Sequence, residues 1–310
     1  MYRYVIKRII MLVPILIGVT FIVFALMSLA PGDPGSIILG ASAEKAHIDA
    51  LNEKLGYNRP FFEKYFTFLR DMVIKQDFGT SYRTQQPVVN EIAARLPISF
   101  QLAFFGLLFS AVIGIPLGVL SAVKQYSLLD TLPSFFAMIM AAVPSFWLGM
   151  MLIYYVAFRW DLLPSYGLGT WQHYIMPTIT IGSVYAASMM RYTRSSMLET
   201  IRADYVRTAR AKGAAERAVI WKHAMKNGLL PVVTLLGSSF GAQIGGAIVT
   251  ENLFSIQGLG NLTILSISTR DTPSVLATTV VFASIYNVIL LLIDIVYAFI
   301  DPRIKAKYSR

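Results

Sequence analysis

The stretch Asp204-Tyr-Val-Arg-Thr-Ala-Arg-Ala-Lys-Gly213, followed by His223 and Pro231, is a polar, basic segment between two long hydrophobic runs. Alanine recurs between 197 and 227, which favours helix, and Gly213 interrupts the pattern. Glycine readily adopts positive φ, so we expect two short helices that meet at a sharp corner. Apolar side chains after the corner, Trp221 among them, are expected to pack back on the rest of the protein. A helical loop kept out of the lipid indicates that a soluble partner docks on it.

The composition is that of an integral membrane protein. Of 310 residues, 55% are hydrophobic and 14% charged, and the mean hydropathy is +0.59, whereas about a quarter of a soluble domain is charged. The absence of cysteine excludes disulfides, thiol nucleophiles and cysteine-bound zinc. Three histidines in separate segments (His47, His173 and His223) do not predict a metal site. We expect neither a metal nor a cofactor on this chain.

Hydrophobic runs of about 20 residues predict transmembrane helices. The sequence contains six such runs, at about Ile9–Ala30, Ile98–Val123, Leu132–Phe158, His173–Met190, Leu229–Thr250 and Val275–Ile300. The first run is longer than the 7–15 residues of a secretory signal, so we interpret it as a retained helix. The predicted fold is an all-α membrane protein, a six-helix transmembrane bundle.

The basic residues predict the orientation. With six spans, one side of the membrane carries both termini and the loop at 191–228, which holds nine basic residues, and the other side has no net charge. Because cytoplasmic loops are rich in lysine and arginine, we expect both termini in the cytoplasm. The same rule accounts for the net charge of +10, so we predict no nucleic-acid partner.

Residues 31–97 form a small polar insert on the opposite, extracytoplasmic side. Helical spacing of apolar residues predicts helices at Asp49–Leu55 and Phe61–Ile74, the second with a stripe of Phe62, Tyr65, Phe66, Leu69, Met72 and Val73. The insert is too small for a large core of its own, so we expect it to rest on the ends of the spans. The predicted division is 1–30, 31–97 and 98–310, the last with the loop 191–228.

Glycines recur every fourth residue in two predicted spans: Gly237, Gly241 and Gly245 in the fifth, and Gly114 and Gly118 in the second. Small residues allow close helix packing in lipid, and they could equally leave room for a solute in a passage; both interpretations stay open. Two carboxylates, Glu251 and Asp294, lie in or near the hydrocarbon, where they usually face protein or water. We interpret Asp294 as structural, paired with basic loop residues and sharing a face with Asp301, and Glu251 as a candidate gate.

The sequence contains no catalytic constellation. It lacks a Gly-x-x-x-x-Gly-Lys-Ser/Thr loop, a His-Glu-x-x-His motif and a suggestive Ser-His-Asp spacing. We therefore predict a transport subunit rather than an enzyme. An ion-coupled secondary transporter is an alternative, but it would favour paired intramembrane ionisable groups in a repeated pattern.

The segment quoted first resembles the cytoplasmic EAA loop of ABC importer permeases, and the variant is similar to that of the dipeptide and oligopeptide permeases. Further landmarks of that family extend along nearly the whole chain: Tyr4-Val-Ile-Lys-Arg8, Leu29-Ala-Pro-Gly-Asp-Pro34, Asp77-Phe-Gly-Thr-Ser81, Trp171-Gln-His-Tyr-Ile-Met-Pro177, Gly258-Leu-Gly260 and Asp294-Ile-Val-Tyr-Ala-Phe-Ile-Asp-Pro-Arg303. Gln257 departs from the proline that usually precedes Gly-Leu-Gly, and Gln76 from the glycine that often precedes Asp-Phe-Gly.

The resemblance implies a fold of the ABC importer type and a subunit of a binding-protein-dependent importer in a bacterial or archaeal inner membrane. The expected partners are a second permease, two ATPases that bind ATP and magnesium, an extracytoplasmic solute-binding protein and membrane lipid. The expected ATPase-coupling residues are Tyr205, Arg207, Thr208, Ala209, Arg210, Ala211, Lys212, Gly213, His223 and Pro231. A translocation path or gate is expected at Gly237, Gly241, Gly245, Glu251, Asn252 and Gln257. Peptides are the commonest cargo of the family; glutathione, nickel and other small solutes are alternatives.

Overall fold

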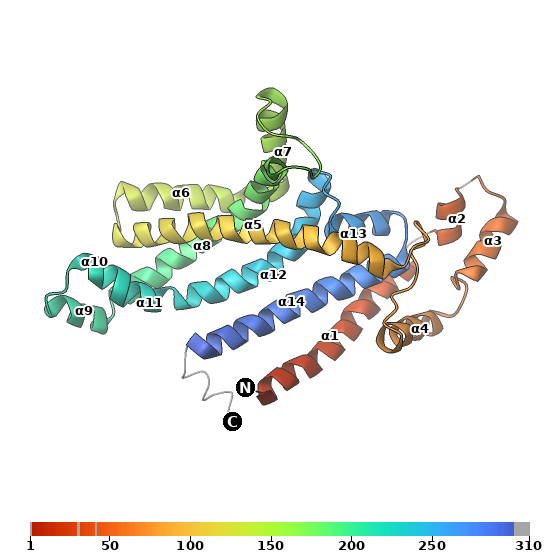
Figure 1. Cartoon of the computed structure of the whole chain (residues 1–310), viewed down its shortest axis with the longest axis horizontal. Helices are drawn as coiled ribbons and strands as arrows, with labels where there is room; N and C mark the ends of the chain where they lie inside the picture. The colour runs from red at the N-terminus through yellow and green to blue at the C-terminus, as the bar shows by residue number, and fades with distance from the viewer. Residues whose placement is uncertain (1, 30–31, 41, 301–310) are drawn as a thin grey trace. The chain divides into compact units, whose positions relative to one another are not determined.

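A computed structural model describes residues 2–29, 32–40 and 42–300, and this part of the chain is helical with no strand beyond one isolated bridge (Figure 1). The predicted all-α class is confirmed. The described chain divides into two compact units, one of residues 100–256 and 288 onward, the other of 2–99 and 257–287.

Four helices contain an apolar stretch long enough to cross a membrane: α1 (Tyr2–Leu29), α5 (Val88–Val123), α12 (Leu230–Leu253) and α14 (Thr272–Ile300). A fifth span is present if α6 (Leu128–Ala142) and the helix from Ser145 to Arg159, bent by 100°, cross together. By length and composition, the described residues therefore contain four or five helices that could cross a membrane, where the sequence predicted six. The 36-residue α5 is about 54 Å long, so it extends well beyond the roughly 30 Å hydrocarbon layer.

The predicted third span, Leu132–Phe158, is broken in the middle. Helix α6 ends at Val143, whose backbone is extended (φ −76°, ψ 125°), and α7 (Ser145–Leu152) begins after Pro144 and continues as a π-helix, η1 (Ile153–Arg159). The ring of a proline disfavours the helical region for the residue before it. Pro144 thus explains why one hydrophobic run became two helices.

The predicted fourth span corresponds to the first half of α8 (Ile175–Ile201), which is not apolar enough to count as a span. This helix is the centre of its unit: it contacts α6, α7, α11 and α12, and Met189, Met190 and Met197 are fully buried. A helix surrounded by other helices presents little surface to lipid, so its own hydropathy need not be high. The fourth span therefore stays a prediction.

In the second unit, α4 (Phe61–Ile74) packs on α1. The Tyr65 hydroxyl donates to the Ile17 carbonyl oxygen (2.8 Å) and lies 3.1 Å from the Thr20 hydroxyl. Phe21 and Phe24 of α1 meet the Phe61 and Tyr65 rings. The predicted apolar stripe is only partly buried, because Phe62, Phe66 and Val73 are exposed: the stripe is wider than the face that α1 covers.

Two carboxylates connect neighbouring segments of the second unit by hydrogen bonds. Asp33 caps α2 (Pro34–Leu39) through the Ser36 amide (2.8 Å) and accepts from the Asn52 side chain (2.6 Å) of α3 (Lys45–Lys54). Burial opposes its charged form, but these hydrogen bonds outweigh it and lower the pKa of Asp33. Buried Asp271, just before α14, accepts from the Ser81 hydroxyl and the Tyr82 amide. It ties the 77–87 loop to the turn between α13 (Leu259–Ser268) and α14.

Candidate functional site

The loop between α8 and α12 has the predicted corner. Helix α9 (Asp204–Ala211) ends at Gly213, whose φ is +80°, and α10 (Glu216–Ala218), the π-helix η3 (Val219–Ala224) and α11 (Met225–Gly228) follow (Figure 1). The Gly213 amide donates to the Arg210 carbonyl oxygen (2.9 Å), and the Ala214 amide to that of Ala209 (3.3 Å). No atom would obstruct a Cβ on Gly213, so the backbone conformation, rather than space, requires glycine here.

A small hydrophobic core anchors this corner to the helix ends. Val206 and Ala209 of α9 and Val219 and Ile220 of η3 are buried, together with Val119 and Ala122 of α5 and Met197 of α8. The apolar positions of α9 are three residues apart, so they share one face of a short helix. The corner is therefore a packed extension of the first unit.

An ion pair spans the corner. The Arg210 guanidinium donates to both carboxylate oxygens of Glu216, from Nη2 at 2.7 Å and from Nε at 3.0 Å. The hydrogen bonds from Arg210 hold the pKa of Glu216 below its ordinary value, against a small opposing effect of burial. A planar, two-point pair fixes geometry as well as charge, so Arg210 and Glu216 brace α9 against α10.

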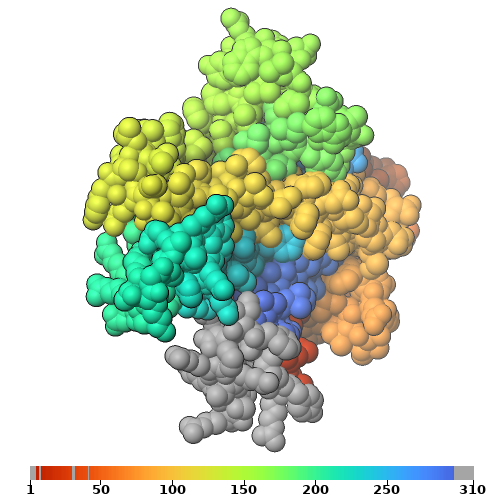
Figure 2. All heavy atoms as spheres, turned by 60° about the vertical axis from the view of Figure 1, so that its left-hand side comes forward, coloured from red at the N-terminus to blue at the C-terminus, as the bar shows by residue number. Residues whose placement is uncertain are grey.

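The predicted coupling residues divide into two groups. Tyr205, Arg207, Thr208, Ala211, Lys212 and Gly213 are exposed, and they form the outer face of the corner. Ala209 is buried inside it, Arg210 makes the brace, His223 is half-buried, and Pro231 occupies the first turn of α12. Figure 2 shows this loop (teal) toward the viewer, beside the yellow atoms of α5 and α6. The exposed face is the part of the loop that is free to meet another protein.

A buried ion pair below the loop was not predicted. Arg194 of α8 donates to Asp130 of α6 from Nε (2.6 Å) and Nη2 (2.8 Å), and the carboxylate also accepts from the Ser121 hydroxyl of α5 and the Tyr126 amide (2.9 Å). The Asp130 side chain is 5% exposed. Both residues follow predicted hydrophobic runs in the sequence, and a pairing across 64 positions leaves no local pattern that would reveal it. This cluster, named the α6–α8 clamp below, joins three helices.

The glycines predicted to line the translocation path have different surroundings. A Cβ on Gly237 would lie 2.2 Å from Ile293 of α14, so this glycine serves close helix packing, and Gly241 is buried. Gly245 is exposed with no neighbour within 4 Å. Close packing therefore accounts for Gly237, while a passage with room for a solute beside Gly245 stays a prediction. Gly114 and Gly118 of α5 pack against the backbone of α8.

The polar residues predicted for the path have different surroundings. Glu251 is fully buried near the end of α12, and its carbonyl oxygen accepts from the Ile256 amide (2.8 Å). Asn252 donates from its side chain to the Ile248 carbonyl oxygen (2.8 Å). Gln257 belongs to the second unit and is exposed. Asp301, which the sequence placed on the same helix face as Asp294, lies outside the described residues, and the pairing of Asp294 with basic loop residues stays a prediction.

Sequence reasoning missed Gln243, in the middle of α12. Its side chain is fully buried, and neither its amide nitrogen nor its amide oxygen has a hydrogen-bond partner among the described residues. Gly106 of α5 makes room for it, since a Cβ there would lie 2.3 Å from the Gln243 oxygen. A glutamine in a hydrophobic run is a weak signal in the sequence, and only packing reveals that it points into the protein.

The second unit contains a hollow of about 400 Å³ with charges of both signs. Lys54, Arg59 and Lys64 line it, as do Asp71 and Asp77. Tyr82 lies in its wall; burial and the nearby Asp271 carboxylate raise the pKa of Tyr82 to about 12. Such a mixed lining suits polar molecules or protein segments that carry both charges.

The described chain is that of a helical, multi-pass membrane protein with a braced helical loop outside its apolar helices. Two family models match the chain: the binding-protein-dependent transport system inner membrane component over residues 114–306, and the N-terminal part of such membrane components over residues 1–103. The chain therefore belongs to the binding-protein-dependent transport system inner membrane components, and it is a permease subunit of an ABC importer.

Similar proteins agree along the whole length. The chain is 38% identical to a dipeptide transport system permease protein, DppB, of Alkalihalophilus pseudofirmus, with 98% of this chain and 100% of that protein covered. It is 37% identical to the glutathione transport system permease protein GsiC of Escherichia coli K12, with 99% and 100% covered. These relatives are transport permeases and not enzymes.

One solved structure supports the fold. The methionine ABC transporter MetNI in an inward-facing conformation contains a chain that matches with a TM-score of 0.57 at 18% identity, covering 68% of this chain and 96% of the other. The fold is thus that of the transmembrane subunits of ABC importers.

Proposed function

We propose that the loop 191–228 is the coupling element on which an ATPase subunit docks, and that its contact face consists of Tyr205, Arg207, Thr208, Ala211, Lys212 and Gly213. The observation that carries this proposal is the combination of an exposed outer face with a buried inner face on a braced corner. The complete importer contains a second permease, two ATPases that bind ATP and magnesium, and an extracytoplasmic binding protein. Both termini and this loop lie in the cytoplasm.

The corner is suited to act as a lever. Its hydrophobic core joins α9 to α5 and α8, and the α6–α8 clamp joins these helices to α6. Movement of a docked ATPase is thereby passed to several helices at once, and rigid-body motion of the bundle gives alternating access. The contact between the loop and the ATPase must differ in free energy between the two access states of the bundle, because a contact that is equally strong in both states shifts no equilibrium.

We propose di- or oligopeptides as the cargo. The DppB relative is named for dipeptides, and the GsiC relative, named for glutathione, carries a molecule that is itself a small peptide. The hollow with charges of both signs is compatible with solutes that carry an ammonium and a carboxylate. Nickel and other small solutes are alternatives on the same fold. Gly245, Glu251, Asn252 and Gln257 remain our candidates for the path or gate.

The coupling role is tested at Gly213 in the assembled importer. A β-branched residue at φ near +80° is strained by about 1–3 kcal/mol, so Gly213→Val should reduce uptake and weaken the response of ATPase activity to the binding protein. Asparagine tolerates this region of φ, so Gly213→Asn is the matched control and should keep most of the uptake. Normal uptake by Gly213→Val would exclude the coupling role.

The cargo is tested separately. Proteoliposomes that contain the importer and its binding protein should accumulate a labelled dipeptide when ATP is supplied inside. Competition by glutathione, tripeptides and nickel then ranks the alternatives. Accumulation that follows a proton gradient without ATP would instead support the secondary transporter.

A further inference from the structure

An apolar groove runs between α5 and the loop after the Gly213 corner. It has a volume of about 630 Å³. Ile115, Val119, Leu120 and Val123 of α5 line one side, and Ile220 and Trp221 of η3 line the other. Leu120 and Val123 are also exposed, so the groove opens onto the apolar outer face of α5. In a chain that spans a membrane, that face meets lipid.

A second hollow adjoins the groove and has a different lining. Ala215, Ala218 and Lys222 line it together with Arg217 and Trp221, which both hollows share. Neither Arg217 nor Lys222 has an ion pair or a hydrogen bond to any described residue, and both are exposed. Glu216 also lines the groove, but its carboxylate already accepts two hydrogen bonds from Arg210. The mouth of the apolar groove therefore carries two cations that nothing in the described chain neutralises.

Trp221 stands between the two hollows. Its side chain is 59% exposed, although the sequence predicted that it would pack back on the protein. An exposed indole is costly in water but favourable at the boundary between acyl chains and headgroups. Its place at the junction of an apolar groove and a basic hollow marks such a boundary.

We propose that these two hollows bind one anionic phospholipid. An acyl chain occupies the groove beside α5, the phosphate headgroup pairs with Arg217 and Lys222, and Trp221 packs at the level of the glycerol. The occupant is a lipid because the groove is continuous with the lipid-facing side of α5, and it is anionic because the mouth has only unpaired positive charge. The site adjoins the coupling loop without including its outer face, so the lipid supports the loop from the membrane side.

The test measures lipid bound to the complete importer in detergent. Purified complexes are exchanged into micelles with equal phosphatidylglycerol and phosphatidylcholine, and retained lipid is counted by native mass spectrometry over a titration. We expect a preference for phosphatidylglycerol. Each basic side chain near an anionic headgroup contributes about fivefold in affinity, so Arg217→Gln with Lys222→Gln should weaken phosphatidylglycerol binding roughly 30-fold.

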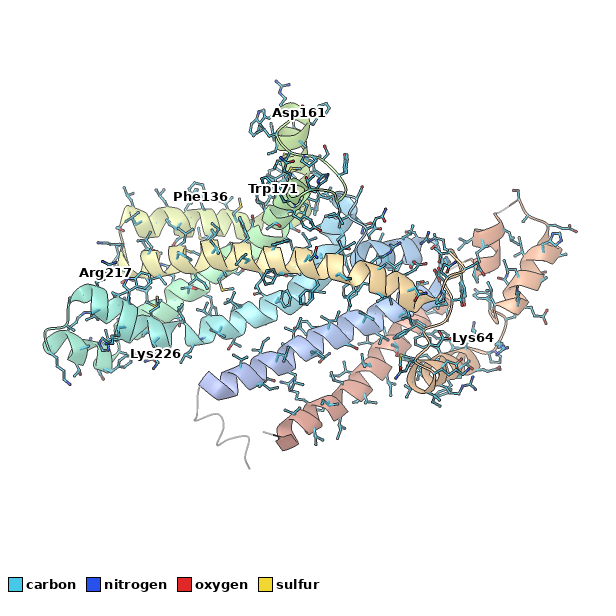
Figure 3. The ribbon with its side chains drawn as sticks, viewed as in Figure 1. Lys64, Phe136, Asp161, Trp171, Arg217 and Lys226 are labelled. Carbon is cyan, nitrogen blue, oxygen red and sulfur yellow. The ribbon has the colours of Figure 1, made fainter. Side chains whose placement is uncertain are left out.

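The matched control is Lys226→Gln. Lys226 is exposed, lies one turn after Lys222 and lines neither hollow; Figure 3 shows it apart from Arg217. This substitution alters the charge of the loop as Lys222→Gln does, and it should leave lipid binding unchanged. An equal loss in Lys226→Gln would show a general charge effect and would overturn the site.

The groove is tested with a bulky side chain. Leu120→Trp fills it from α5 and should remove the retained lipid, whereas Leu108→Trp, at an exposed apolar position three turns away, should not. A photo-reactive residue at position 120 should cross-link phospholipid. The proposal is overturned if wild-type complexes show no preference for phosphatidylglycerol, if Leu120→Trp retains lipid normally, or if position 120 cross-links to a partner subunit instead.

Discussion

The α6–α8 clamp allows a direct test of how the helices below the coupling loop are held together. Asp130→Asn keeps the shape of the side chain but removes its charge. The carboxylate receives two hydrogen bonds from Arg194, one from the Tyr126 amide and one from Ser121. The substitution therefore leaves the Arg194 guanidinium, which is 29% exposed, without its counter-charge.

The expected loss of stability follows from this geometry. Breaking a buried ion pair by removing one partner costs about 3–5 kcal/mol. Because Arg194 keeps some contact with solvent, we expect Asp130→Asn to cost about 3 kcal/mol, at the lower end of this range. Asp204→Asn is the control, since the Asp204–Arg207 pair is 4.0 Å apart and highly exposed, and it should leave stability nearly unchanged.

The assay is a double-mutant cycle on the purified importer, with the stability of the permease followed by denaturant titration in detergent. Asp130→Asn, Arg194→Gln and the double variant give the coupling energy, which should be about 2 kcal/mol for groups in direct contact. If the double variant loses the sum of the two single losses, the two side chains do not stabilise each other, and our account of the clamp is wrong. Equal losses for Asp130→Asn and Asp204→Asn would contradict it as well.

Three further outcomes are expected. Gly237→Ala should lower the thermal midpoint of unfolding in detergent, because its Cβ would meet α14 at 2.2 Å and overpacking costs about 1–3 kcal/mol, while Gly245→Ala, at an open position, should not. Gln243→Met should raise that midpoint, because it removes a buried amide without a partner among the described residues; a lower midpoint would show that the amide is needed. Arg210 lowers the pKa of Glu216 from its ordinary 4.5, so the ion pair should stabilise the corner fully above pH 4.5 and lose that effect as the pH falls through the lower pKa of the folded state. Amide hydrogen exchange at residues 210–217 should therefore rise in acid relative to exchange in the Glu216→Gln variant. An identical pH profile in that variant would refute the role of the ion pair as a brace.

The sequence predicted local features well wherever a short pattern was sufficient. The helix at Phe61–Ile74 appears with the predicted bounds, and the corner at Gly213 has the predicted positive φ. The coupling segment was found because its polar, alanine-rich composition contrasts with the hydrophobic runs on both sides. Patterns of this kind depend on neighbours a few residues apart, which the sequence displays directly.

Features that depend on distant residues were predicted poorly. The division into 1–30, 31–97 and 98–310 stays a prediction, and the described residues contain four or five helices that could cross a membrane, where the sequence predicted six. Asp130 and Arg194 look like ordinary loop charges until folding places them 2.6 Å apart. Gly237 and Gly245 have the same spacing signal, yet one packs on α14 and the other is open.

The amino-acid sequence by itself determined the membrane class, the family and the place of the glycine corner, because composition, hydrophobic length and backbone preference are properties of short segments. Tertiary structure decided which face of that corner is buried, which charges are paired and where an apolar groove meets unpaired cations. Those outcomes depend on which helices touch, and burial and pairing arise only when residues far apart in the chain come into contact.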